Sequence, residues 1–124
     1  MRNLVTGVAV GRMIFGVLLL AKPQEATRGW IGRRAASNGG TQTVTRGLGA
    51  RDLTLGAGAL AALVSGRDAR NWVLAGAIGD AADFGATATA DDIPLAGRVA
   101  VLGMAASAVA VSAGYLLGSK ELAQ

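Results

Sequence analysis

Charged residues interrupt two segments of this chain that are otherwise apolar. Arg51 and Asp52 stand near the start of one segment, and Asp80 and Asp83 lie deep inside the other. Aspartates three residues apart share one face of a helix, and a carboxyl group held in an apolar pocket can act as a proton carrier. Asp80 and Asp83 are therefore the candidate catalytic residues. Arginine side chains can hold a polar oxygen or a carboxylate, and the candidate substrate-binding residues are Arg12, Arg46, Arg51, Asp52 and Arg98.

The composition is that of a membrane protein. Hydrophobic residues make up 52% of the chain and charged residues 16%, whereas soluble domains have roughly 25% charged residues. The apolar content comes from Ala, Val, Leu and 19 glycines, with only 4% aromatic residues. Small residues allow helices to approach closely in lipid. The alternative, a soluble Ala-rich helical bundle, fits the low charge less well.

The chain contains no cysteine and no histidine. Disulfides, thiol chemistry, His-ligated haem and His or Cys zinc sites are therefore excluded. An Asp-x-x-Asp pair can bind Mg²⁺ and pyrophosphate, but the residues that accompany such a pair in head-group transferases are absent around Asp80 and Asp83. We accordingly expect no metal and no cofactor. The net charge of +4 is spread over loops and helix ends, which favours contact with anionic lipid and not with nucleic acid.

The apolar pattern predicts one all-α domain over residues 1–124, an antiparallel four-helix transmembrane bundle with helices at about 4–21, 48–64, 72–89 and 95–117. One long polar loop connects the first two helices. Its first half, residues 23–36, can form a short interfacial helix with Trp30 directed toward lipid. Its second half, residues 37–45, contains Asn-Gly-Gly and is expected to be flexible.

Chain direction in such a bundle brings the embedded charges together. Arg12 lies near mid-depth, Arg51 and Asp52 near one face, Asp80 at the centre and Asp83 one turn toward the same face. Arg98 lies in the first turn of the last helix, again on that side. A lone charge at the bilayer centre costs about 2.5–3.5 kcal/mol on insertion scales. We therefore expect these charges to form a paired network in one half of the bundle.

The network has three alternative interpretations. Buried ion pairs can fix helix register without binding anything. They can also form the polar end of a binding or catalytic pocket, or part of an ion or proton path. Embedded charge supports functional use in general and does not select among these uses.

The segment Arg46 to Gly56, R-G-L-G-A-R-D-L-T-L-G, together with D-A-A-D at 80–83, resembles small four-helix membrane proteins known only as a domain-of-unknown-function family and DoxX-like in build. The resemblance spans nearly the whole chain and implies an integral membrane protein. It implies no reaction, because fold-level likeness does not supply a function.

The sequence thus predicts a small integral membrane protein whose Arg/Asp cluster forms a pocket for a lipophilic molecule, quinone-like or polyketide-like. The alternative is a non-enzymatic membrane subunit or assembly partner with a structural cluster. Whether it is an enzyme is left open. The expected partners are the lipid bilayer, such a small molecule, and a second copy or other membrane subunits. The expected location is the bacterial plasma membrane, with cytoplasmic termini favoured by the first helix and the short 65–71 turn.

Overall fold

The computed structural model describes residues 1–121, with side chains up to Gly118. This part of the chain is all-α, with six helices and no strand. The helices are α1 (Arg2–Ala21), α2 (Pro23–Ile31), α3 (Arg33–Ala36), α4 (Gly39–Val64), α5 (Arg70–Thr89) and α6 (Leu95–Glu121). Residues 122–124, the end of the expected polar tail, lie outside the described residues.

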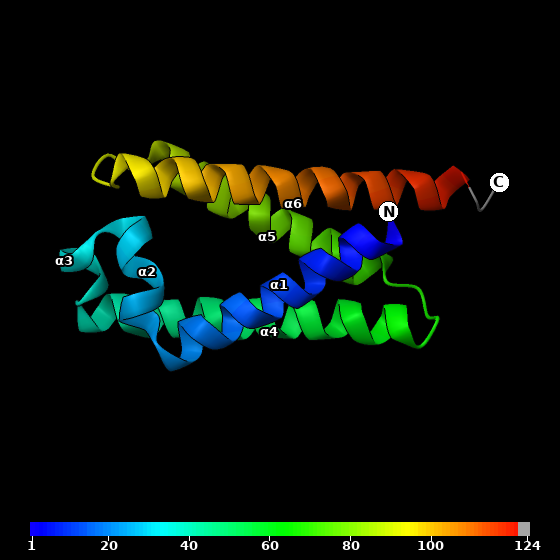
Figure 1. Ribbon diagram of the computed structural model, residues 1–124, viewed down its shortest axis with the longest axis horizontal. Helices are drawn as coiled ribbons and strands as arrows, with labels where there is room; N and C mark the ends of the chain where they lie inside the picture. Colours follow the sequence, from blue (N-terminus) through cyan, green and yellow to red (C-terminus); the bar gives the residue numbers. More distant parts are fainter. Residues whose placement is uncertain (122–124) are drawn as a thin grey trace.

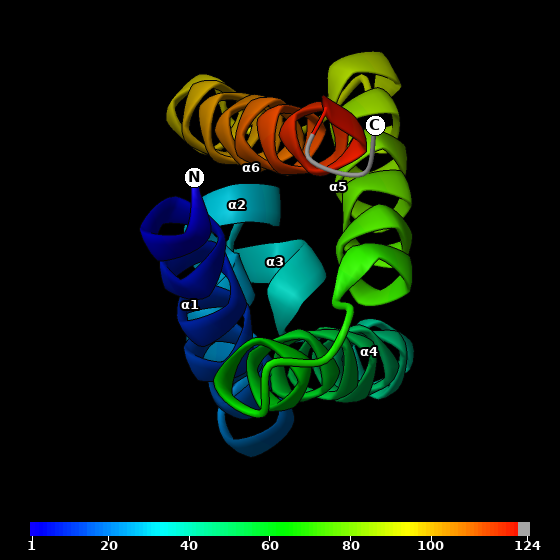
Figure 2. The ribbon, with the colours of Figure 1, turned by 90° about the vertical axis from the view of Figure 1, so that its right-hand side faces the viewer.

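Viewed end-on, the four long helices are arranged in a ring, and the two short ones lie at one end of the molecule (Figures 1 and 2). In Figure 1, α1 lies along α4 in one layer, and α5 and α6 form the other. α2 contacts α1, α4 and α6, so it joins the two layers at the end far from the N-terminus. This arrangement therefore brings together helices from distant parts of the sequence.

The contact between α1 and α4 depends on small residues. A Cβ added to Gly16 would lie 2.7 Å from the carbonyl oxygen of Gly49, and one added to Gly56 would lie 2.6 Å from that of Ala9. These helices approach backbone to backbone, as small residues allow in membranes. Gly7 and Gly11, which form a G-x-x-x-G in the sequence, have nothing near them, so that motif is not the contact face within the chain.

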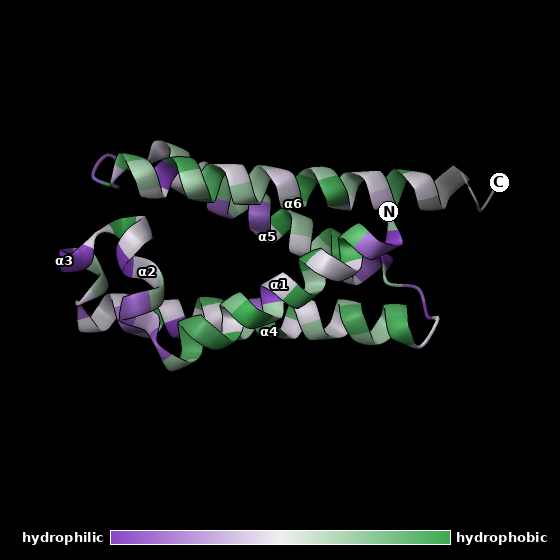
Figure 3. Ribbon diagram, in the orientation of Figure 1, coloured by the Kyte–Doolittle hydropathy of each residue, from purple (hydrophilic) through white to green (hydrophobic). Residues whose placement is uncertain are grey.

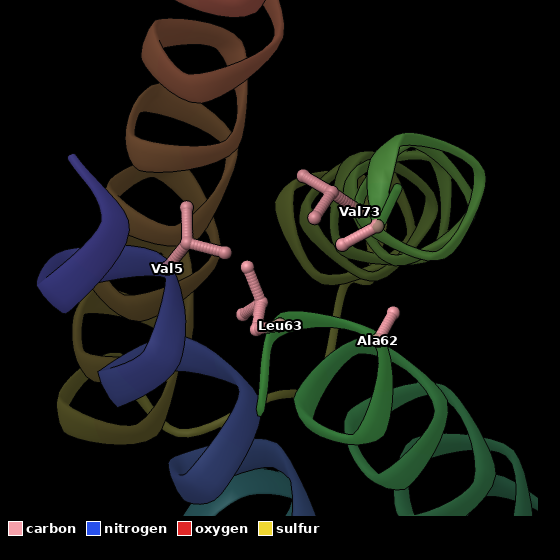
Figure 4. Packing of buried hydrophobic residues seen from close by; sticks show 5 residues of the cluster. Val5, Ala62, Leu63 and Val73 are labelled. Carbon is pink, nitrogen blue, oxygen red and sulfur yellow. The ribbon is translucent and has the colours of Figure 1, made fainter. Parts of the chain in front are cut away.

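A compact apolar cluster closes the other end of the molecule. Val5, Ala62, Leu63, Ala69 and Val73 come from α1, α4, the following turn and α5, and their side chains gather at one point (Figure 4). Val111, Tyr115 and Leu116 of α6 pack against this cluster. All four long helices meet here, so the cluster fixes their relative positions at the end of the molecule away from α2.

The outer surface of the long helices is apolar. Ile14, Val17, Ile78, Val99 and Leu117 are all among the exposed large hydrophobic residues, and hydrophilic residues concentrate in α2, α3 and the connections (Figure 3). α1, α4 and residues 95–118 of α6 are long and apolar enough to cross a membrane. α5, which contains two aspartates, is not among these three helices. An apolar exterior around buried charge is the arrangement of a protein whose solvent is lipid.

The connection between the first two long helices is helical in its first half, as the sequence indicated, whereas the expected flexible second half is wrong. Residues 23–36 form α2 and α3, and α4 starts at Gly39, so the region expected to be flexible is helical. The Asn38 side chain accepts hydrogen bonds from the backbone amides of Gly40 at 2.9 Å and Thr41 at 3.3 Å. This N-cap satisfies free amides at the start of α4, so Asn-Gly-Gly begins a helix instead of prolonging a loop.

Candidate functional site

Arg12 joins three helices. Its Nη2 donates a hydrogen bond to Oδ2 of Asp80 on α5 at 2.6 Å, and its Nη1 donates to Oδ1 of Asp52 on α4 at 3.4 Å. The Arg12 side chain is 9% exposed and that of Asp52 5%. Removing one partner of a buried ion pair leaves an uncompensated charge. The position of α1 relative to α4 and α5 is therefore coupled to these two contacts.

Arg51 forms the second half of the same network. Its Nη2 lies 3.0 Å from Oδ1 of Asp52 and 2.8 Å from Oδ2 of Asp83, and Nη1 lies 3.5 Å from Oδ1 of Asp83. Asp52 thus accepts from both arginines and connects the two halves. The Arg51 side chain is 33% exposed, so this half of the network is more open than the half around Arg12.

Two glycines of α5 make room for the two guanidinium groups. A Cβ on Gly76 would lie 3.0 Å from Nη2 of Arg12, and a Cβ on Gly79 would lie 3.3 Å from Cζ of Arg51. Each glycine precedes by four residues the aspartate that its arginine binds, so glycine and aspartate share a helix face. Each arginine therefore lies across a glycine and reaches the carboxylate one turn further along.

The cluster expected from the sequence forms in part. Arg12, Arg51, Asp52, Asp80 and Asp83 meet, and this part of the prediction is confirmed. Their use in catalysis or binding stays a prediction.

Arg46 and Arg98 lie outside the network. Nε of Arg46 donates to the Leu20 carbonyl at 3.3 Å, and the Arg98 guanidinium donates to the carbonyls of Thr87, Ala88 and Ala90. Carbonyl oxygens at the end of a helix lack intrahelical partners and attract cations. The expectation that Arg98 belongs to the ion-pair network is wrong, because its guanidinium binds the carbonyls at the end of α5 and not the clustered aspartates.

A cavity of about 580 Å³ adjoins the network. Its charged lining residues are Arg12, Asp52, Asp80 and Asp83. The rest of its wall is mainly apolar and comes largely from α1 and α6, with Val8, Phe15, Val99, Met104, Ala105 and Val111 among its lining residues. Small-molecule sites usually have 300–1,000 Å³, apolar walls and a few convergent polar groups. This cavity has each of those properties.

Trp30 is a residue of the cavity that sequence reasoning placed elsewhere. Its indole lines the cavity, and Nε1 donates a hydrogen bond to Oγ1 of Thr87 on α5 at 3.2 Å. The Thr87 side chain is fully buried. Trp30 therefore faces inward from α2 instead of serving as a lipid-facing anchor. A tryptophan within a polar connection was the one sequence feature that marked this residue. Its inward direction follows only from the docking of α2 across the long helices.

Neither a scan of known protein families nor searches among curated proteins and solved structures finds a match to this chain. No function carries over to the site from a relative. The chemistry of the site rests on its own geometry.

That geometry offers hydrogen-bond acceptors more readily than donors. Nη1 and Nη2 of both arginines are directed at aspartates. Asp80 Oδ1 and Asp52 Oδ2 have no hydrogen-bond donor among residues 1–121. The expectation that the arginines hold a substrate oxygen stays a prediction, since Nη1 and Nη2 of each already donate to carboxylates. The carboxylates provide the free polar atoms, and their oxygens can accept a hydrogen bond or a proton.

Proposed function

We propose that this protein binds a lipophilic small molecule in the cavity between α1, α5 and α6, with the polar end of the molecule against the Arg/Asp network. The observation that carries the proposal is the union of one charged wall with an otherwise apolar cavity of about 580 Å³. The apolar walls contact the hydrocarbon or ring surface of the ligand, and the polar wall fixes the orientation of the ligand in the cavity. A quinone-like or polyketide-like ring is the class of molecule that such a cavity would take.

The cavity would be reached from within a membrane. The protein is proposed to span the bacterial plasma membrane four times, through α1, α4, α5 and α6, with cytoplasmic termini. α5 has the same length as α1, 20 residues, and its aspartates are paired toward the interior, which lowers the cost of placing them at membrane depth. This topology is testable because the chain has no native cysteine.

Single cysteines at Asp68 and Asp91 test it, because these residues lie just before and just after α5. A membrane-impermeant maleimide applied to intact cells should label one position and not the other. Labelling of both positions from the same side would mean that α5 does not cross the membrane.

Ligand binding is tested with decylubiquinone and the fluorescence of Trp30. Trp72→Phe leaves Trp30 as the one tryptophan of the chain, and a quinone that enters the cavity should quench it. Ala108→Phe places a ring in the cavity and should abolish saturable quenching. Ala110→Phe on the same helix, outside the cavity lining, should leave it unchanged. Equal quenching in both variants would show that the quinone acts from the bilayer and would refute cavity binding.

A structural role for the cluster has its own supporting observation. Every one of the five clustered charges has an opposite partner within 3.4 Å, which is what a network that only locks helix register requires. Under this alternative the protein is a non-enzymatic membrane subunit or assembly partner, and the open faces around Gly7 and Gly11 would bind a second copy or another subunit. Absence of saturable quenching together with normal folding of Ala108→Phe would favour it.

A further inference from the structure

The charges that face the cavity do not balance. Three carboxylates and one guanidinium line it, those of Asp52, Asp80, Asp83 and Arg12. The second guanidinium, that of Arg51, is not a lining group, because it lies against Gly79 and contacts Asp52 and Asp83. Over the whole network, three carboxylates face two guanidinium groups. The cavity therefore has an excess of negative charge on its polar wall.

The carboxylate atoms left over belong to largely buried residues and are accessible from the cavity, because every fully buried side-chain oxygen in the described part of the chain has a hydrogen-bond partner. Asp80 is 9% exposed and Asp52 4%, and each uses one oxygen for the arginines. The second oxygen of each, Oδ1 of Asp80 and Oδ2 of Asp52, receives no hydrogen bond from residues 1–121. Unsatisfied carboxylate oxygens in an apolar cavity are costly unless a donor or a positive charge reaches them.

We infer that the cavity selects lipophilic molecules that end in a primary ammonium group, which binds between Asp80 and Asp52 while the hydrocarbon portion lies along α6. This inference rests on the proposed cavity-binding function and specifies its ligand class. An ammonium group brings one positive charge and three hydrogen-bond donors. It therefore balances the negative charge of the wall and provides donors for the two free carboxylate oxygens. A carboxylate ligand would add a fourth negative charge.

A bound metal ion would fit the excess charge less well. No group of three or more acidic residues among the described side chains is arranged to hold a metal ion. Ca²⁺ and Mg²⁺ require six or more oxygen ligands, usually including water, and the remaining cavity wall is apolar. In an organic cation the charged group pairs with the carboxylates, and the hydrocarbon chain contacts the apolar wall.

The cavity wall that α1 and α6 share includes residues that are exposed on the outside of the molecule. The two helices meet where Val5 packs near Val111 and Tyr115, and they diverge toward the end occupied by α2 (Figure 1). In the diverging region, Val99 and Met104 line the cavity and are 62% and 61% exposed. A single-chain amine dissolved in the bilayer could therefore enter sideways, with its head group moving toward Asp80.

The experiment uses three matched probes in lipid nanodiscs: 10-bromodecylamine, 10-bromodecanol and 10-bromodecanoate. The Trp72→Phe protein reports binding through quenching of Trp30 by the bromine atom. The amine should bind at least about tenfold more tightly than the alcohol, a difference of about 1.4 kcal/mol, and the carboxylate should bind most weakly. Asp83→Asn removes one carboxylate from the wall and should reduce the preference for amine over alcohol by at least about threefold, since the ion-pair attraction depends on net charge. Asp91→Asn, an exposed aspartate outside the cavity, is the matched control and should retain the full preference.

The outcomes separate the inference from the function on which it rests. One outcome is that all three probes quench saturably with equal affinity and that Ala108→Phe abolishes the quenching. The cavity then binds ligands, and the ammonium inference is overturned. If Ala108→Phe changes quenching by none of them, cavity binding itself fails. An amine preference that Asp91→Asn reduces as much as Asp83→Asn does would assign the effect to general surface charge and would also overturn the inference.

Discussion

The guanidinium of Arg12 lies against Gly76 of α5 and donates a hydrogen bond to Asp80, one turn further along the same helix, at 2.6 Å. Gly79 and Asp83 stand in the same relation to Arg51. The pattern Gly-x-x-x-Asp thus occurs twice in α5, offset by three residues. The glycines belong to the ion-pair network with the aspartates, because a Cβ at either position would lie in tight contact with a guanidinium, 3.0 Å from Arg12 Nη2 or 3.3 Å from Arg51 Cζ.

Gly76→Ala should therefore destabilise the protein although it improves helix propensity. The added methyl group would lie 3.0 Å from Nη2 of Arg12, closer than ordinary contact. The matched control is Gly85→Ala in the same helix, where no atom lies near the added Cβ and where a gain of up to about 1 kcal/mol is expected. SDS titration followed by far-UV circular dichroism measures both. Equal stabilisation by the two substitutions would show that Arg12 does not depend on Gly76.

Asp80→Asn should lower the free energy of unfolding by about 2 kcal/mol, the usual contribution of a hydrogen bond to a charged group. Arg12 would lose its shortest contact, although Asp52 would still compensate part of its charge. Asp91→Asn, an exposed aspartate, should change stability by less than about 0.5 kcal/mol. The same SDS titration compares the two. If Asp80→Asn lowers the free energy of unfolding by less than Asp91→Asn does, the buried pair does not stabilise the fold.

Chain direction predicted that six charges would meet, and five of them do. Helix rise and the alternation of up and down segments place these charges in one half of the bundle, between mid-depth and one face. Buried charges in lipid have to pair. What depth cannot supply is the rotation of each helix about its axis. Arg98 was assigned to the network because its depth is suitable, but its side chain points to the end of α5. The roles of Gly76 and Gly79 escaped notice for the same reason.

The Arg51–Asp83 pair should show thermodynamic coupling. Arg51→Leu leaves Asp83 without its partner, and Asp83→Leu leaves Arg51 with Asp52 alone. The double variant removes both charges, so its loss of stability should be smaller than the sum of the two single losses by about 1–2 kcal/mol. A double-mutant cycle in one detergent provides the measurement. Additive losses would show that the 2.8 Å contact contributes nothing to stability.

The approach of α1 to α4 should tolerate no side chain at Gly16. A Cβ there would lie 2.6 Å from the backbone nitrogen of Leu53 and 2.7 Å from the Gly49 carbonyl oxygen, and backbone atoms cannot move as a flexible side chain can. We expect Gly16→Ala to cost more than about 2 kcal/mol, as overpacking of a close interface does. Gly11→Ala, on the same helix with open space around it, should be neutral or stabilising. Thermal unfolding in detergent distinguishes them, and similar melting temperatures would contradict the backbone contact.

The segment between the first two long helices shows where composition misleads. A short helix was expected over residues 23–36, where α2 and α3 lie, but the Asn-Gly-Gly run is typical of a loop and instead lies at the start of α4. Pro23 opens α2 at its first position, where proline is well tolerated, and Asn38 caps α4. These start signals were visible in the sequence. The docking of Trp30 on Thr87 was not, because it depends on the contact of α2 with both layers.

Arg98 provides the test that separates helix capping from the ion-pair network. Its guanidinium binds the carbonyls of Thr87, Ala88 and Ala90, which end α5. Arg98→Met should therefore cost about 1 kcal/mol, as loss of a cation at a helix C-terminus does, and should raise amide hydrogen exchange in the last turn of α5. Exchange around Asp80 should stay unchanged, because Arg98 makes no ion pair with the clustered aspartates. Asp80→Asn should give the opposite pattern, with faster exchange at the centre of α5 and a protected last turn. Faster exchange throughout α5 in both variants would mean that the cap and the network form one cooperative unit, and the separation drawn between them would be wrong.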